Sequence, residues 1–165
     1  MFSDPNFYSA FHFMLTAHEG QKDKVGNAYW EHPLRVAKKC QEAEYGVSAI
    51  IVSLLHDVLE DTQYTLEDIC QKVALSEDEQ KALILLTRKS NETYAEFIER
   101  IAQSAHPIAI RVKIKDLEHN MDLSRFALRG VEPTKKDYER ITKYFHAYQK
   151  LVEALKKEKC VFQFV

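Results

Sequence analysis

The chain has 165 residues, of which 45% are hydrophobic and 29% are charged, and its formal net charge is −2. This size and balance are typical of one compact globular domain and exclude a disordered chain. Four glycines and four prolines are too few for a collagen-like or turn-rich all-β protein. The charge gives no global basic field for nucleic acid, no apolar run is long enough to span a membrane, and no signal-peptide pattern opens the chain. Three dispersed cysteines fit reduced thiols, so we expect a single cytoplasmic domain over residues 1–165, with no nucleic-acid or membrane partner.

The first predicted elements are helices. Residues 6–19 carry apolar side chains at the spacing of one helix face and stop at Gly20. A polar loop over residues 21–28 leads to Pro33, which fits the first turn of a second helix. That helix should run to about Tyr45, with Gly46 as its C-cap. Residues 47–59 are apolar around nearly the whole circumference, which predicts a central, buried helix.

Four later helices share one start signal, a hydroxyl residue followed three positions on by an acid, which forms a capping box. The pairs are Thr65 with Asp68, Ser76 with Glu79, Thr93 with Glu96, and Thr134 with Asp137. A further helix is predicted from Pro107 to about Phe126, and the last from Lys135 to about Lys157. Apolar and polar residues never alternate long enough for a convincing strand. The sequence therefore predicts an all-α bundle.

Four ionisable residues crowd the end of the predicted central helix: His56 and Asp57, then Glu60 and Asp61 one turn later. Charges buried there would be costly unless paired, and the close carboxylates would repel one another. A divalent metal ion resolves both problems. The alternative is a capped helix end, with His56 hydrogen-bonded in the core and the acids in solvent.

Two further residues extend this set. His32 stands at a helix start, where a capping or surface histidine is the ordinary reading. Asp116 interrupts a core-seeking helix, with Lys113 three positions before and Asn120 four positions after, so a salt bridge to a neighbouring lysine is its simplest explanation. With His56 and Asp57, however, they make a set of two nitrogens and two oxygens suited to Mn²⁺, Fe²⁺ or Zn²⁺. A purely structural zinc site is not expected from two imidazoles and no thiolate.

These motifs resemble the HD-domain phosphohydrolases, and more narrowly the hydrolase half of the RelA/SpoT-type stringent-response enzymes and the free-standing small alarmone hydrolases. The matching segments occur in family order over most of the chain, and the block from His56 to Thr62 is the most specific of them. The others are Ala17-His18 with Gln21, Gly26 with Tyr29 and His32-Pro33, Thr65, Thr87-Arg88-Lys89, and Lys113 to Met121.

The resemblance implies an HD-type helical domain in which one divalent ion, typically Mn²⁺, is bound by four side chains. These are His32, His56, Asp57 and Asp116. It also implies that Glu60 and Asp61 act as the acid/base pair that positions and deprotonates the attacking water. A carboxylate one turn beyond the ligands can take that proton. We expect His18 and His119 to be packing residues rather than ligands.

A nucleotide substrate is the implied partner, and five residues are expected to contact it: Lys24, Tyr29, Lys113, Asn120 and Arg125. Cations gather in the segments next to the predicted site, which suits a multiply phosphorylated small molecule. Lys135, Lys136 and Lys143 fit instead the solvated face of the last helix. Two positions depart from the alarmone hydrolases, because Asp23 and Leu117 stand where that family has arginines.

The expected activity is metal-dependent hydrolysis of a phosphorylated nucleotide, foremost removal of the 3′-pyrophosphate of guanosine-3′,5′-bis(diphosphate) (ppGpp) or a related alarmone. The alternative is an HD-type phosphatase acting on nucleoside monophosphates or NADPH, since Asp23 and Leu117 weaken the expected guanine recognition. A nucleotide-sensing module without catalysis is the remaining possibility.

Overall fold

The computed structural model describes residues 4–24, 26–128 and 130–161, and their side chains except those of residues 125 and 158–161. Helices make up the fold, as the sequence predicts, and within the described ranges the only β-type pairing is an isolated bridge between Lys22 and Ala28. The helices are α1 (Pro5–Ala17), α2 (Glu31–Glu42), α3 (Val47–Leu55), α4 (Val58–Asp61), α5 (Leu66–Cys70), α6 (Glu77–Leu86), α7 (Tyr94–Gln103), α8 (Pro107–Asn120), α9 (Ser124–Ala127) and α10 (Lys135–Val161). No helix in these ranges is both long and apolar enough to cross a membrane.

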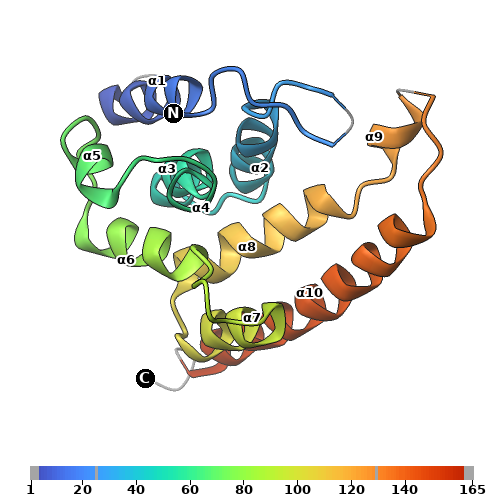
Figure 1. Ribbon diagram of the computed structural model, residues 1–165. Helices are drawn as coiled ribbons and strands as arrows, with labels where there is room; N and C mark the ends of the chain where they lie inside the picture. Colours follow the sequence, from blue (N-terminus) through green and yellow to red (C-terminus); the bar gives the residue numbers. More distant parts are fainter. Residues whose placement is uncertain (1–3, 25, 129, 162–165) are drawn as a thin grey trace.

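The centre of the bundle is α3, as predicted. All its residues from Ala49 to Leu55 are buried, and it packs against α1, α2, α6 and α8. Figure 1 shows α3 surrounded by these helices. Burial on every side explains why its sequence is apolar around the whole circumference.

The predicted capping boxes are present. Thr65, Ser76 and Thr93 each accept a hydrogen bond from the backbone N–H three residues on, and the acid at that position accepts one from the cap's own N–H. Thr134 and Asp137 form the same reciprocal pair, with N···O distances of 2.9 and 3.3 Å, at the start of α10. These caps satisfy N–H groups that the helices leave unpaired.

Three predicted helices are interrupted or end early, and the last helix runs on to Val161 rather than ending near Lys157. The helix expected over residues 47–59 is divided into α3 and α4 by a turn at His56 and Asp57. There the His56 ring nitrogen Nδ1 lies 2.7 Å from the Ser53 carbonyl oxygen, which a continuous helix would offer to a backbone N–H. Asp57 has a ψ of −8°, well away from the ~−42° of an α-helix.

The second misplaced end belongs to α2, which finishes at Glu42 rather than near Tyr45. The left-handed position after it is taken by Glu44, with a φ of 55°. Gly46, expected as the C-cap, is instead the residue before α3, with a φ of 87°. Glycine suits that conformation because it has no Cβ.

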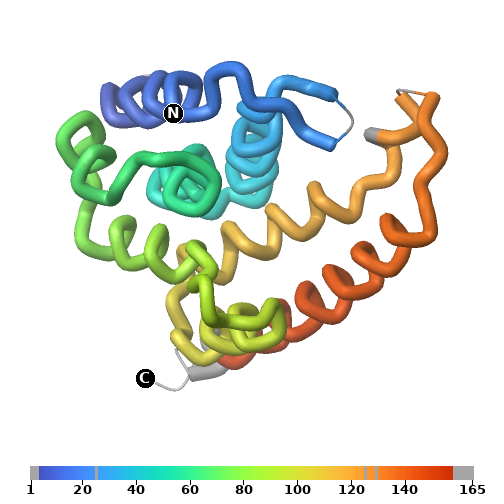
Figure 2. The backbone as a smooth tube through the Cα atoms, in the orientation of Figure 1, coloured from blue at the N-terminus to red at the C-terminus, as the bar shows by residue number. Residues whose placement is uncertain are grey.

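The third correction concerns α8, which ends at Asn120 rather than near Phe126. The Asp122 carboxylate accepts a hydrogen bond from the Ser124 N–H at 2.9 Å, a local turn that competes with helix continuation. The chain then forms the short α9 before returning along α10. Figure 2 shows the chain turning at the α9 end and α10 running back alongside α8.

One ion pair fixes the last turn of α7 to the end of α6 and to the loop between the two helices. Arg100 donates two hydrogen bonds to the Glu92 carboxylate, at 2.7 and 2.8 Å, and one each to the carbonyl oxygens of Leu85 and Thr87 at 3.1 Å. The planar guanidinium thus joins α7 to the end of α6 and to the loop between them.

Replacing Glu92 with glutamine is expected to lower the free energy of unfolding by about 1 kcal/mol, allowing for solvent screening. Hydrogen bonds to Arg100 lower the pKa of Glu92 to about 2, against ~4.3 in an unfolded chain. The stabilisation is therefore complete above that unfolded value and is lost as pH falls towards 2. Urea titrations of wild type and Glu92→Gln at pH 7 and pH 3 should give curves that differ more at pH 7. An equal difference at both pH values would contradict this.

Candidate metal centre and active-site cavity

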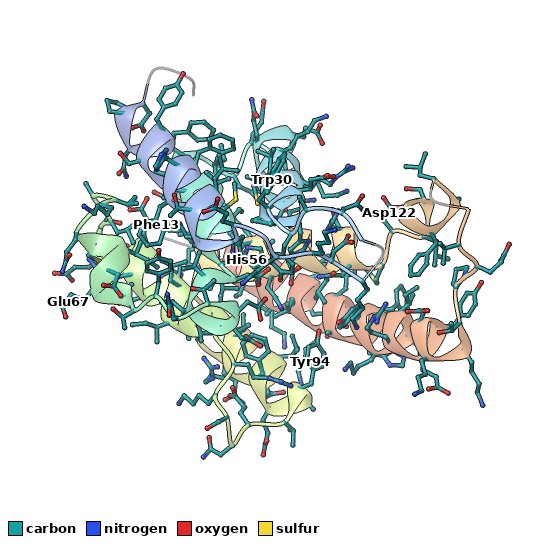
Figure 3. The ribbon with its side chains drawn as sticks, turned by 45° about the horizontal axis from the view of Figure 1, so that its top comes forward. Phe13, Trp30, His56, Glu67, Tyr94 and Asp122 are labelled. Carbon is teal, nitrogen blue, oxygen red and sulfur yellow. The ribbon has the colours of Figure 1, made fainter. Side chains whose placement is uncertain are left out.

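Three segments bring two histidines and two aspartates together in the interior. His32 comes from the first turn of α2, His56 and Asp57 from the turn between α3 and α4, and Asp116 from α8. The His32 Nε2 atom lies 3.3 Å from Asp57 Oδ2 and 3.1 Å from Asp116 Oδ1. The His56 Nε2 atom lies 3.2 Å from Asp57 Oδ1 and 3.8 Å from Asp116 Oδ1. Figure 3 shows His56 where these segments meet.

The second nitrogen of each imidazole is held by the protein. His56 Nδ1 lies 2.7 Å from the Ser53 carbonyl oxygen, so it carries a proton and donates. His32 Nδ1 lies 2.7 Å from His119 Nδ1, an arrangement that requires one ring to donate to the other. Such contacts commonly orient metal-binding histidines and select their tautomer. Both Nε2 atoms are thereby turned towards the two aspartates.

The donor set fits a divalent cation. The Nε2 atom of His56 is buried and has no hydrogen-bond partner, although two carboxylates lie close to it. Donors about 2.1 Å from one ion stand ~3.0–3.4 Å from one another, and three of the four distances above fall within that range. His32, His56 and Asp57 each offer an atom within 4.8 Å of the others. These residues can hold a metal ion, and Asp116 adjoins them.

We call His32, His56, Asp57 and Asp116 the cluster. Without an ion, attraction between its histidines and aspartates holds it together. Burial tends to lower the pKa of His32, but hydrogen bonds to Asp116 and Asp57 raise it to about 9. Burial would raise the pKa of both aspartates, but neighbouring cations hold it below the usual range. The main cation is His56 for Asp57 and Lys113 for Asp116. A divalent ion would replace the protons on the histidines as the compensating charge.

Asp116 is also held from its own helix. Lys113 Nζ donates to its Oδ2 at 2.7 Å, and Asn120 Nδ2 donates to its Oδ1 at 2.5 Å. The lysine pairing expected from the sequence is therefore present alongside the histidine contacts. Lys113 stays charged despite its burial, because Asp116 raises its pKa.

The two acids after the cluster have different partners. Asp61 is joined to the cluster through Tyr29, whose hydroxyl oxygen lies 2.6 Å from Asp61 Oδ2 and 2.9 Å from Asp57 Oδ2. Glu60 accepts a hydrogen bond from the Arg88 N–H at 3.0 Å, and both acids are exposed. Both carboxylates line the same cavity as the cluster.

That cavity, of about 490 Å³, is lined by residues of the histidine–aspartate cluster, of the loop before α2, and of helices α8 and α10. Of the five residues expected to contact substrate, Lys24, Tyr29, Lys113 and Asn120 line it. The side chain of Arg125 lies outside the described residues. Four further cations also line it. Lys22 comes from the same loop as Lys24, and Arg88, Arg140 and Lys143 come from distant segments.

The residues that the sequence analysis missed are aromatic and come from α7, α9 and α10: Tyr94, Phe97, Phe126 and Tyr144. Aromatic side chains at helical spacing have the pattern of core residues, so no local signal marks them. Lys143, expected on the solvated face, is exposed but also lines the cavity. Asp23 and Leu117, which the resemblance places where the alarmone hydrolases have arginines, both border the cavity.

The histidines expected to serve as packing residues lie beside the cluster. His18 is fully buried, and its Nδ1 atom lies 2.8 Å from Gln21 Oε1. Burial lowers its pKa. His119 is buried against the ring of His32, with ring centroids 4.8 Å apart.

Comparison with known proteins gives the following relatives. No protein-family model matches the chain. It is 31% identical over 124 residues to a probable GTP pyrophosphokinase of Mycobacterium leprae, covering 71% of this chain and 16% of that protein. It is 36% identical over 112 residues to the bifunctional (p)ppGpp synthase/hydrolase SpoT of Escherichia coli, covering 64% and 16%. The chain thus spans about one sixth of the length of these curated relatives.

A solved structure matches over nearly the whole length of both chains. It is that of a metazoan ortholog of SpoT, described as hydrolysing ppGpp and playing a role in starvation responses. The TM-score is 0.69 at 25% sequence identity, covering 92% of this chain and 86% of that one. With the sequence relatives above, this match shows that the chain belongs to the family of RelA/SpoT-type (p)ppGpp hydrolase domains.

Proposed function

We propose that this chain is a metal-dependent hydrolase that removes the 3′-pyrophosphate of ppGpp, with water as co-substrate and GDP and pyrophosphate as products. The observation that carries the proposal is the buried cluster of His32, His56 and Asp57 in a fold that matches a ppGpp-hydrolysing protein over 92% of the chain. The cavity beside the cluster is lined by cations, which suits an anionic substrate.

In this proposal His32, His56, Asp57 and Asp116 hold one divalent ion, for which we propose Mn²⁺. When bound, such an ion lowers the pKa of a water molecule and offsets negative charge on phosphoryl oxygens. The protein keeps the ligands in place through the Ser53 carbonyl behind His56 and through Lys113 and Asn120 beside Asp116.

Glu60 and Asp61 are proposed to move the protons. Each carboxylate can accept a proton from the attacking water or return one to the leaving oxygen. Tyr29 positions Asp61, because its hydroxyl lies within hydrogen-bond distance of both Asp61 and Asp57. Glu60 Oε2 accepts a hydrogen bond from the Arg88 N–H, its Oε1 lies 4.0 Å from Arg88 Nε, and the residue lines the cavity.

Substrate binding is assigned to the cations of the cavity. Lys24 and Lys22 come from the loop before α2, and Arg88, Arg140 and Lys143 from the opposite side. Together with Lys113 they can neutralise the charges of two pyrophosphate groups. Asn120 donates to Asp116 and is proposed to contact the substrate through its remaining polar atoms.

The test is turnover of ppGpp by the protein loaded with Mn²⁺, with GDP and pyrophosphate measured by chromatography. We expect both products in equal amounts, and none after chelation of the metal. Protein that holds the metal but leaves ppGpp intact would refute the proposal.

One observation favours a second candidate, phosphate release from a nucleoside monophosphate or NADPH. The Asp23 carboxylate accepts hydrogen bonds from the N–H of Asn27 at 2.8 Å and from its side-chain amide at 3.3 Å, so it is turned into its own loop. It cannot stack on guanine as an arginine would. A nucleotide panel assayed for orthophosphate against pyrophosphate separates the two candidates, since only the first releases pyrophosphate from ppGpp.

A further inference from the structure

One polar atom beside the cavity has no partner among the described residues. The hydroxyl of Tyr94 is buried and makes no hydrogen bond, although Tyr94 lines the cavity. Burial raises its pKa, so at neutral pH the hydroxyl keeps its proton and is a donor. A buried hydroxyl without a partner destabilises the fold, which makes a ligand a natural reason for its retention.

The ring that carries this hydroxyl is held on several sides. Tyr94 is the first residue of α7, directly after the Thr93 cap. Its ring centroid lies 5.7 Å from that of Tyr144 on α10 and 6.3 Å from that of Phe97. Figure 3 shows Tyr94 between α7 and α10, below His56 in that view. The hydroxyl is thus fixed before any ligand arrives.

The side chain that lies on the Tyr94 ring is that of Lys143, a long and flexible lysine. Lys143 Nζ lies 4.4 Å from the centroid of the Tyr94 ring and 5.6 Å from that of Tyr144. Lys143 is exposed, it makes no salt bridge among the described residues, and it lines the same cavity. A cation stacked on an aromatic ring at an exposed site is held only weakly, so an anion can attract it away from the ring.

If substrate occupies the cavity as proposed, its phosphate groups are the anions that can approach Tyr94 and Lys143. Lys113 lines the cavity next to Tyr94, and its charge acts on the tyrosine. Lys113 in turn pairs with Asp116, which lies 3.1 Å from His32 in the metal cluster. Tyr94 and the proposed metal site therefore face the same cavity, and the ion pair of Lys113 with Asp116 lies between them.

We propose that the Tyr94 hydroxyl and the Lys143 ammonium group together bind a phosphate oxygen of the substrate. In the free protein Lys143 lies on the Tyr94 ring and covers it. A phosphate group entering the cavity attracts Lys143 off the ring and accepts a hydrogen bond from the hydroxyl that this exposes. The inference rests on the proposed function for the identity of the substrate, but the pair would bind any pyrophosphate group placed there.

The experiment compares Tyr94→Phe and Lys143→Met with two controls from the same helix as the lysine, Tyr138→Phe and Lys135→Met. Tyr138 and Lys135 are exposed and remain outside the cavity lining. We expect each test variant to lower kcat/KM for ppGpp by roughly 10- to 100-fold, the range for a hydrogen bond to a charged group. The controls should stay within about twofold of wild type.

Two further readouts separate a binding role from a structural one. The double variant should lose less than the product of the single losses, because both groups bind the same oxygen. The melting temperature of Tyr94→Phe without ligand should equal or exceed that of wild type, since the variant removes an unpartnered hydroxyl. A lower melting temperature, full multiplicativity, or unchanged kcat/KM in either variant would each overturn the inference.

The binding of inorganic pyrophosphate, measured by calorimetry with Mn²⁺-loaded protein, keeps this test separate from the test of the proposed function. If wild type fails to hydrolyse ppGpp, the proposed function fails. The inference then stands if both variants bind pyrophosphate at least about tenfold more weakly, and falls if they bind it as wild type does.

Discussion

Replacing Asp116 with alanine is expected to leave the purified protein without bound metal and to lower kcat/KM for ppGpp by roughly 10³-fold or more. The carboxylate lies 3.1 Å from His32 Nε2 and 3.8 Å from His56 Nε2, so its removal takes one of the two acidic ligands from the proposed site. Asp57→Ala should have the same effect, because Asp57 is the other acidic ligand and lies beside the same two histidines. Metal content by elemental analysis, measured beside steady-state rates, checks both.

Asp116 also neutralises Lys113, whose side chain is only 13% exposed, so the alanine variant leaves a buried charge unpaired. That loss destabilises the fold by about 3 kcal/mol. Asp116→Asn is therefore the second variant, because its amide oxygen still accepts from Lys113 while its negative charge is gone. Asp78→Ala, on an exposed part of α6, is the matched control. Full metal content in Asp116→Asn would remove Asp116 from the ligand set.

Glutamine at Glu60 is expected to leave metal and substrate binding intact while kcat falls by roughly 10²–10⁴-fold. The carboxamide keeps the shape of the side chain, and its oxygen can still accept the hydrogen bond that the Arg88 N–H donates at 3.0 Å. What it loses is the ability to take a proton from the attacking water. Rates, KM and metal content of the same preparation distinguish this result from loss of the site.

Two companion variants make the result specific. Glu77→Gln changes an exposed glutamate at the start of α6 and should leave kcat unchanged. Asp61→Asn tests the second acid, which Tyr29 holds beside the cluster at 2.6 Å. Near-normal kcat in Glu60→Gln together with a large loss in Asp61→Asn would transfer the proton-moving role from Glu60 to Asp61.

The helices were predictable because their signals are local. A hydroxyl residue and an acid three positions later satisfy each other's backbone without help from the rest of the chain, and all four such pairs are present. The division between α3 and α4 was not predictable in this way. It depends on the ring of His56 reaching the Ser53 carbonyl, and apolar spacing carries no information about that contact.

The same difference between local and long-range signals applies to the candidate site. The grouping of His32, His56, Asp57 and Asp116 could be predicted because His56 and Asp57 are adjacent and the remaining residues occur in a family order. The aromatic residues that line the cavity could not be predicted, because Tyr94 and Tyr144 become neighbours only when α7 packs on α10. Lys113 and Asn120 fall between these cases, since helical spacing places both beside Asp116 but does not reveal which polar atoms remain for a ligand.

The turn between α3 and α4 has a consequence for how the protein can be altered. Adjacent residues on a regular helix point about 100° apart, which does not favour placing both at one ion. Here Nε2 of His56 and Oδ1 of Asp57 are 3.2 Å apart, because the backbone unwinds between them. A substitution that straightened this segment into one uninterrupted helix would improve local regularity and separate the two donors. Selection for thermal stability alone would therefore drive this segment away from activity.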